Sequence, residues 1–251
     1  MDTIILKNKC AIDKMRTAGR QLALIMQDVV ALIVPGADTA SIDAFIEKRM
    51  LVAGLKPECK GYGGYRFATC ISLNDVVVHG IPSKEVILKS GDFVKIDVVG
   101  SYKGYCADLA RYFFVGNVNP VAQRMADTAQ QALDAAIALA KPGLKLSDIS
   151  STIQNIVEQE GFGVVRDFAG HGIGKNLHEA PNIPNYGKPG QGPTLQEGMT
   201  LAIEPMISEK SYKVHIMDDG WTAKTIDGGL AAHVEDTVVV TKNGVEVLTR
   251  L

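Results

Sequence analysis

Apolar positions at helical spacing predict two helices at the start of the chain. The first helix carries Met15, Ala18, Leu22, Ile25, Val29 and Ile33 and stops before Pro35-Gly36. The second carries Ile42, Phe45, Ile46, Met50 and Ala53 and ends at Gly54. After about residue 66 the pattern changes to short β-rich runs, which read FATCISLN, VVVHGI, FVKIDVVG and CADLARYFFVG.

The same order of elements then follows a second time. Two helices are predicted over Val121 to Ala140 and Leu146 to Glu160, and strand-like runs such as MTLAIEPMI and VEDTVVVT come after them. One offset of 107 positions joins four pairs of landmarks: Pro35 and Pro142, Gly54 and Gly161, Gly91 and Gly198, Asp97 and Glu204. We therefore expect a single domain over residues 1–251 with an internal pseudo-repeat, about 12–116 and 119–250, and one site in the cleft between the halves.

Between these elements, the stretch richest in proline and glycine runs from Pro181 to Gln196 and reads PNIPNYGKPGQGPTLQ. We expect it to be a surface connection, because these residues favour turns.

Composition and charge exclude several classes of protein. The chain has 251 residues, of which 46% are hydrophobic and 22% charged, as expected of a globular protein with a core. A net charge of −2 argues against nucleic-acid binding as the main task. The four cysteines form no C-x-x-C pair, so we expect free thiols and no zinc knuckle. The first residues do not resemble a signal peptide, and no apolar stretch is long enough to span a membrane, so we expect a cytoplasmic protein.

Acidic residues stand out within the strand-like runs. Asp97 and Asp108 lie on two runs joined by a short turn, and with Tyr102-Lys103 at its tip they would be directly opposite on one face. The hairpin alone leaves open an exposed acidic pair. Glu204 and Glu235 lie in apolar runs of the second half, where a lone carboxylate is costly to bury. Four carboxylates converging in one cleft predict roughly two divalent cations.

Histidines accompany these acids. His171 and His178 lie in the glycine-rich run GHGIGKNLHEAP, and His79 follows an apolar strand in VVVHGIP. Each could singly be a structural histidine, but together with the four acids they favour a metal site of the kind that takes Mn, Fe, Co or Zn. We expect His215 to be structural or exposed.

The motifs that hold these residues resemble those of a known family. The runs CISLNDVVVHGIP, GDFVKIDVVGSYKGYCADLARYFFVG, GHGIGKNLHEAP, GMTLAIEPM and AHVEDTVVVT resemble the successive motifs of type I methionine aminopeptidases, from about Ile12 to Leu248. The resemblance implies the bacterial short form of an α+β pita-bread fold: two pseudo-symmetric halves, each with two helices and a mainly antiparallel sheet, with the active site in the central cleft.

The resemblance also implies roles. Asp97 would chelate one of two divalent metal ions, Asp108 and Glu235 would bridge both, and His171 and Glu204 would complete the other. A bridging water or hydroxide would be the nucleophile, Glu204 the general base, and His79 and His178 the imidazoles that orient the scissile amide. The wall that receives the methionine side chain would contain Cys59, Tyr62, Tyr65, Cys70, Leu177 and Trp221.

The chain departs from the family pattern at three places. Leu177 stands where an aromatic residue is usual, Gly63 where a polar residue is often found, and Glu235 lies in His233-Val234-Glu235-Asp236 rather than after a glutamine. These departures affect the shape of the pocket and the surroundings of the metals, and they leave the five expected ligands intact.

The resemblance implies removal of the initiator methionine from nascent polypeptides whose second residue is small. Transient ribosome contact and a monomeric state are further expectations. One alternative is a prolidase or Xaa-Pro aminopeptidase on the same fold, which usually carries an extra N-terminal domain for which we expect no room here. The other is a non-catalytic binding relative, although such proteins lose metal ligands.

Overall fold

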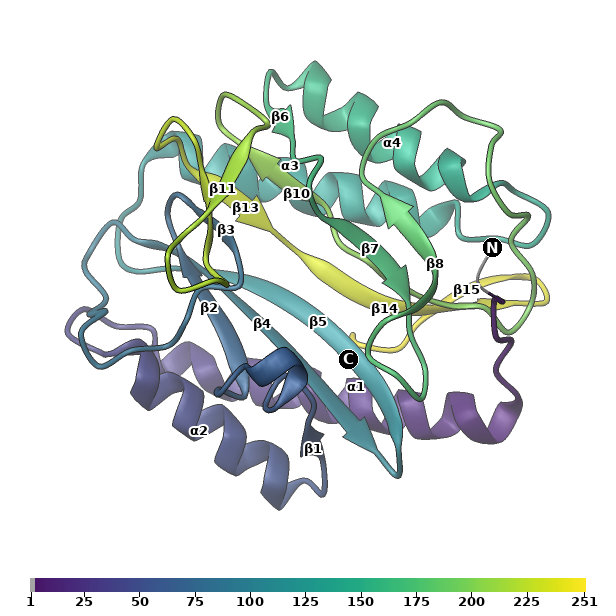
Figure 1. The fold of residues 1–251 in the computed structure, drawn as a ribbon, viewed down its shortest axis with the longest axis horizontal. Coiled ribbons are helices and arrows are strands. Elements are labelled where there is room, and N and C mark those ends of the chain that lie inside the picture. Colours follow the sequence, from purple (N-terminus) through teal and green to yellow (C-terminus); the bar gives the residue numbers. More distant parts are fainter. Residues whose placement is uncertain (1–2) are drawn as a thin grey trace.

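In the computed structural model, which describes residues 3–251, one curved sheet is flanked by helices at both ends (Figure 1). The helices are α1 (Lys9–Val29), a short 3-10 helix (Val30–Leu32), α2 (Thr39–Val52), a second 3-10 turn (Tyr62–Gly64), α3 (Pro120–Ala138) and α4 (Leu146–Gln159). No helix within the described range is long and apolar enough to cross a membrane.

Nine strands form the large sheet. Its order is β1 (Lys56–Pro57), β4 (Phe93–Tyr102), β5 (Tyr105–Phe114), β14 (Glu235–Thr241), β9 (Thr200–Ile203), β7 (Ala169–Gly172) and β8 (Glu179–Pro184), with β15 (Gly244–Val247) beside β14 and β2 (Thr69–Leu73) beside β4. All these pairs are antiparallel, which agrees with the expected α+β pita-bread fold.

Two small sheets lie next to the large one. One joins β13 (Ala231–His233), β10 (Met206–Ser208) and β6 (Gly163–Val164), and the other joins β11 (Val214–Ile216), β12 (Ala223–Thr225) and β3 (Val76–Val78). The chain passes from the large sheet into the first small sheet between β9 and β10, and returns between β13 and β14. These two crossings bring Glu204 and His233 to the site described below.

The offset of 107 positions reappears in the bounds of the elements. Both ends of α4, Leu146–Gln159, lie 107 positions after those of α2, Thr39–Val52, and β6 lies at the same distance after β1. Each of the two helices is followed by a glycine in the left-handed region, Gly54 (φ 73°) and Gly161 (φ 80°), which ends a helix without steric cost.

Side-chain alternation decides which face of the sheet is free for chemistry. Ile96 and Val98 of β4 pack into one core with α1 and α2, while Val238 and Val240 of β14 pack into a second core with α3 and α4. Because neighbouring residues of a strand point to opposite faces, the residues between these apolar positions point away from the helices. Asp97 is one of them.

The hairpin of β4 and β5 corrects one sequence-based prediction. Asp97 pairs with Ala110 and Asp108 with Val99, so the two acids share a face but lie diagonally, not directly opposite. The turn is one residue further along than expected, with Lys103 (φ 49°) and Gly104 (φ 77°) between the paired Tyr102 and Tyr105. A two-residue hairpin turn of this kind needs positive φ at both central positions, which favours glycine.

The expected surface connection from Pro181 to Gln196 is also partly wrong. Its first four residues belong to β8, Glu179–Pro184, which pairs with β7 at the end of the sheet. Proline is tolerated there because an edge strand leaves one side without ladder hydrogen bonds.

Candidate metal centre and substrate pocket

One cavity contains every site residue that the sequence predicted. It is lined by Cys59, Tyr62, Tyr65, Cys70, His79, Asp97, Asp108, His171, Leu177, His178, Glu204, Trp221 and Glu235. Six further residues complete the lining: Val78, Val99, Phe168, Ala169, Met206 and His233. The cavity therefore joins residues from both halves of the chain.

Strand register explains how three of the acids meet. Asp97 of β4 and Glu235 of β14 both pair with Ala110 of the strand between them, so the three residues form one row across the sheet. The small Ala110 side chain leaves space between the two carboxylates. Asp108 lies two residues before Ala110 on the same face.

His171 and Glu204 reach the cavity from the other end of the sheet. His171 of β7 pairs with Ala202 of β9, and Glu204 follows Ala202 by two residues and so points to the same face. The His171 Nε2 atom lies 3.6 Å from Glu204 Oε1 and 3.8 Å from Asp108 Oδ2. The five predicted ligands are thus gathered at one end of the cavity.

The orientation of His171 suits a metal ligand. Its Nδ1 atom lies 2.9 Å from the carbonyl oxygen of Gly172. A carbonyl can only accept, so Nδ1 carries the proton and the lone pair of Nε2 faces Asp108 and Glu204. Burial lowers the pKa of His171 to about 4, which keeps the imidazole neutral near pH 7.

Burial also makes the acids difficult to ionise without a cation. It raises the pKa of Asp97 to about 6, with Glu204 adding to the shift, and that of Glu204 to about 8. The pKa values of Asp108 and Glu235 are raised well above the usual range, first by burial and then by the neighbouring carboxylates. A cation held among these groups would reverse the shifts.

Unpartnered atoms mark where such a cation fits. Within residues 3–251, five buried side-chain nitrogen or oxygen atoms lack a hydrogen-bond partner, and four of them belong to Asp97, Asp108, His233 and Glu235 at this site. Buried polar atoms are rarely left unpaired. Two groups of ligand atoms, Asp108–His171–Glu235 and Glu204–His233–Glu235, are close enough to hold an ion each. The residues present therefore fit bound divalent cations.

The other two predicted imidazoles lie beside the acids. The ring of His178 lies 4.3 Å from that of His171, between centroids, and its Nδ1 atom is 2.7 Å from the hydroxyl oxygen of Tyr62. The ring of His79 meets those of Phe168 and Trp221 edge-on, at 5.4 and 6.3 Å. Both histidines can therefore face a molecule that occupies the cavity.

Another part of the cavity lining is an apolar wall, which begins beside the acids because Cys70 of β2 pairs with Asp97. Cys59, Tyr65 and Cys70 are buried and pack in one cluster with Leu177 and Trp221. Gly63 keeps this wall close to the indole, because a Cβ atom at that position would lie 3.2 Å from the Trp221 ring. Sulfur and aromatic groups are favourable surroundings for a thioether side chain. His215, in contrast, is exposed on β11 and is not among the residues that line this cavity, as expected.

Sequence reasoning did not assign His233, Phe168 or Met206 to the site. His233 could have been found, because it precedes Glu235 by two residues and a strand would place both on one face. Phe168 and Met206 carry no such pattern in the sequence.

Comparisons with known proteins point to one family of enzymes. Residues 13–242 match metallopeptidase family M24. Methionine aminopeptidase A of Synechocystis sp. is 43% identical over 248 residues, which cover 99% of this chain and 98% of the relative. The crystal structure of methionine aminopeptidase from Thermotoga maritima superimposes with a TM-score of 0.98 at 44% identity, covering 99% of this chain and all (100%) of that one.

The prolidase from Pyrococcus furiosus shares the fold at a TM-score of 0.81 and 26% identity, but this chain covers only 66% of it. The chain belongs to metallopeptidase family M24. Within that family it groups with the bacterial methionine aminopeptidases, which confirms the class of enzyme that its motifs indicate.

Proposed function

We propose that this chain removes the N-terminal methionine from polypeptides whose second residue is small. The observation that supports this most strongly is one cavity that combines two groups of side chains: buried acids and His171 with unpartnered oxygen atoms, and a wall rich in sulfur and aromatic rings. The first group suits metal-assisted hydrolysis and the second suits a methionine side chain.

Asp97, Asp108, His171, Glu204 and Glu235 would hold two divalent cations, of which Co, Mn, Fe and Zn all suit oxygen and imidazole ligands. When bound, the cations supply Lewis-acid polarisation of the scissile carbonyl and lower the pKa of a water molecule.

The protein's own groups would do the remaining work. Glu204, whose carboxylate lies beside His171, is the proposed general base that passes a proton toward the leaving amine. His79 and His178 would orient the scissile amide and donate to the oxygen that becomes negatively charged. Leu177, Trp221 and the residues that pack with them would exclude water from the methionine side chain.

In the cell we propose that nascent polypeptides are the substrate and that the chain works as a cytoplasmic monomer. Transient contact with ribosomes is part of this proposal. A ribosome pull-down at low and moderate salt tests it, and absence of binding at both would refute the contact.

The deciding experiment measures release of the first residue from Met-Gly-Met-Met and Leu-Gly-Met-Met by metal-stripped protein during titration with Mn, Fe, Co and Zn. Methionine release should appear with metal and disappear in Asp108→Ala. The ratio of the two peptides reports what Leu177 does to the pocket. If no metal restores release, the proposal fails and an Ala-Pro substrate tests the prolidase alternative.

A further inference from the structure

His233 lies inside the acidic end of the cavity although it is not one of the five predicted ligands. Its side chain is buried, with 2% of the residue exposed. Its Nε2 atom lies 3.3 Å from Glu204 Oε2 and 3.9 Å from Glu235 Oε2. In the part of the chain that the structure describes, this nitrogen has no hydrogen-bond partner.

The strand geometry holds His233 in that place. It is the last residue of β13 and pairs with Met206 at the start of β10. Glu204 precedes β10 by two residues, and Glu235 begins β14 two residues after His233. Both chain crossings between the large and the small sheet therefore direct a side chain, Glu204 at one and His233 at the other, toward the same point.

The spacing of these atoms matches that of ligands on a shared ion. Two ligand atoms that are each about 2.1 Å from one cation lie about 3.0 Å apart at a right angle and about 3.4 Å apart at a tetrahedral angle. The 3.3 Å distance from His233 Nε2 to Glu204 lies within this range, and the 3.9 Å distance to Glu235 lies beyond it. The distances from His171 to Asp108 and Glu204, 3.8 and 3.6 Å, are of the same kind.

We propose that His233 is a sixth protein ligand, which binds a divalent cation through Nε2 together with Glu204 and Glu235. This inference rests on the proposed metal-dependent function. The two groups of ligand atoms then share Glu235, and each contributes one imidazole: His171 in the first and His233 in the second.

An additional imidazole changes which metals the centre prefers. Nitrogen ligands suit Zn, Fe and Ni, whereas a site made only of carboxylates suits Mn and Mg. The cation beside His233 should therefore be held more tightly when it is Zn than when it is Mn. Replacement of the imidazole by an amide should reduce that difference.

The test uses the whole chain loaded with two equivalents of zinc. X-ray absorption at the zinc edge counts imidazole ligands, and the wild-type protein should show two per chain rather than the one that His171 alone would give. Zinc affinity is then measured by competition with a chelator for wild type, His233→Gln and, as a matched control, His215→Gln on the exposed strand β11. Loss of a residue that only hydrogen-bonds to a metal ligand already lowers metal affinity about 10-fold to 100-fold. Loss of a ligand itself should do no less, so His233→Gln should lower the affinity for the second zinc ion by at least about 10-fold.

The outcomes are distinct. If the wild-type protein binds zinc with only one imidazole, His233 is not a ligand, and the proposed function still stands. His233 would then only contact Glu204, whose Oε2 atom lies 3.3 Å from its Nε2 atom. Equal zinc affinity in wild type and His233→Gln refutes the role of His233 as well. A wild-type protein that binds no zinc, manganese, iron or cobalt refutes the proposed function itself. The imidazole count needs no variant, so the test holds even if His233→Gln does not fold.

Discussion

The hydroxyl group of Thr237 bonds both backbone groups of Asp108: it accepts from the N–H at 2.9 Å and donates to the carbonyl at 2.8 Å. Thr237 lies on β14 and Asp108 on β5, so this one side chain joins the two halves of the sheet next to a proposed metal ligand. Both residues are buried, which means that no solvent replaces these bonds if they are lost.

Thr237→Val should therefore destabilise the protein and disturb the site. Valine keeps the shape but leaves an N–H and a carbonyl unpaired, at a cost of about 1–3 kcal/mol in the free energy of unfolding. Urea unfolding measures this. Thr241→Val, on the half-buried end of the same strand, is the control and should change stability by less than about 0.5 kcal/mol. Equal effects of the two substitutions would contradict the assignment.

The metal-free protein should lose stability as the pH rises from about 6.5 to 8. Burial raises the pKa of Glu204 to about 8, so the folded chain retains a proton there that the unfolded chain has already released. That stability is present at low pH and is lost as the pH approaches the folded pKa. Asp108 and Glu235, whose pKa values are also raised by burial, add to this fall. The buried histidines partly oppose it: burial lowers the pKa values of His171 and His233 to about 4, whereas the unfolded chain still carries part of their protons near pH 6.5.

We expect a fall of about 1–2 kcal/mol in the free energy of unfolding over this interval. Urea unfolding of metal-stripped protein at several pH values measures it. Glu204→Gln cannot titrate and should show a flatter profile, and an unchanged slope in this variant would assign the effect to another group.

Tyr62 positions His178 through the 2.7 Å contact between its hydroxyl and Nδ1. Tyr62→Phe should lower kcat/KM for Met-Gly-Met-Met by about 2-fold to 10-fold, which corresponds to a single hydrogen bond of about 0.5–1.5 kcal/mol. Zinc affinity should stay constant, because neither residue belongs to the proposed ligands. Tyr212→Phe, at an exposed position, is the matched control and should leave both quantities unchanged.

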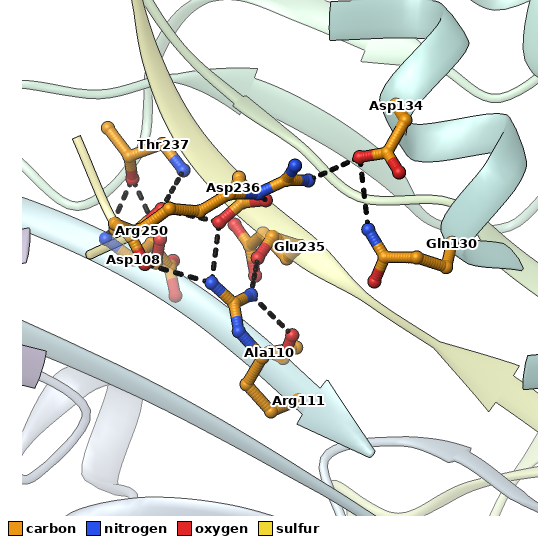
Figure 2. A network of polar contacts seen from close by, with 10 residues as sticks. Asp108, Ala110, Arg111, Gln130, Asp134, Glu235, Asp236, Thr237 and Arg250 are labelled. Carbon is orange, nitrogen blue, oxygen red and sulfur yellow. Dashed lines mark hydrogen bonds and ion pairs between the residues drawn. The ribbon is translucent and has the colours of Figure 1, made fainter. Parts of the chain in front are cut away.

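Asp236 should be among the most sensitive positions for stability. Its side chain is 1% exposed, and its carboxylate accepts from Arg111 and Arg250 at 2.6 Å each (Figure 2). The carboxylate also accepts from the Thr249 hydroxyl at 2.7 Å. Arg111 also donates to the backbone carbonyl of Glu235, so the network fixes the strand that carries a proposed ligand.

Asp236→Ala should cost about 2–3 kcal/mol in the free energy of unfolding, because it removes the buried acceptor of the Thr249 hydroxyl and of two partly exposed guanidinium groups, those of Arg111 and Arg250. Asp134→Ala removes the other carboxylate that Arg250 contacts, but at the surface, and should cost less than about 1 kcal/mol. Thermal and urea unfolding compare the two variants, and a similar loss in both would show that burial of Asp236 is not what matters.

The sequence by itself determined the helices, the main strands and the identity of the acids. The spacing of apolar residues set α1 to α4 to within a few residues, because one face of each helix must be buried. The alternation in β4 and β5 placed Asp97 and Asp108 on the same face, since strand side chains alternate strictly. The motifs then identified the family, which no physical pattern alone could do.

Only the tertiary structure decided how these pieces meet. The hairpin turn lies one residue further along the chain than expected, so Asp97 pairs with Ala110 and not with Asp108. The backbone conformation at Lys103 and Gly104, not the run of apolar residues, decides where the turn forms. The strand β8 formed from a proline-rich stretch because the edge of a sheet tolerates proline. His233 faces Glu204 because two strands cross between sheets at the same point, and such a contact between residues far apart in the chain has no local signature.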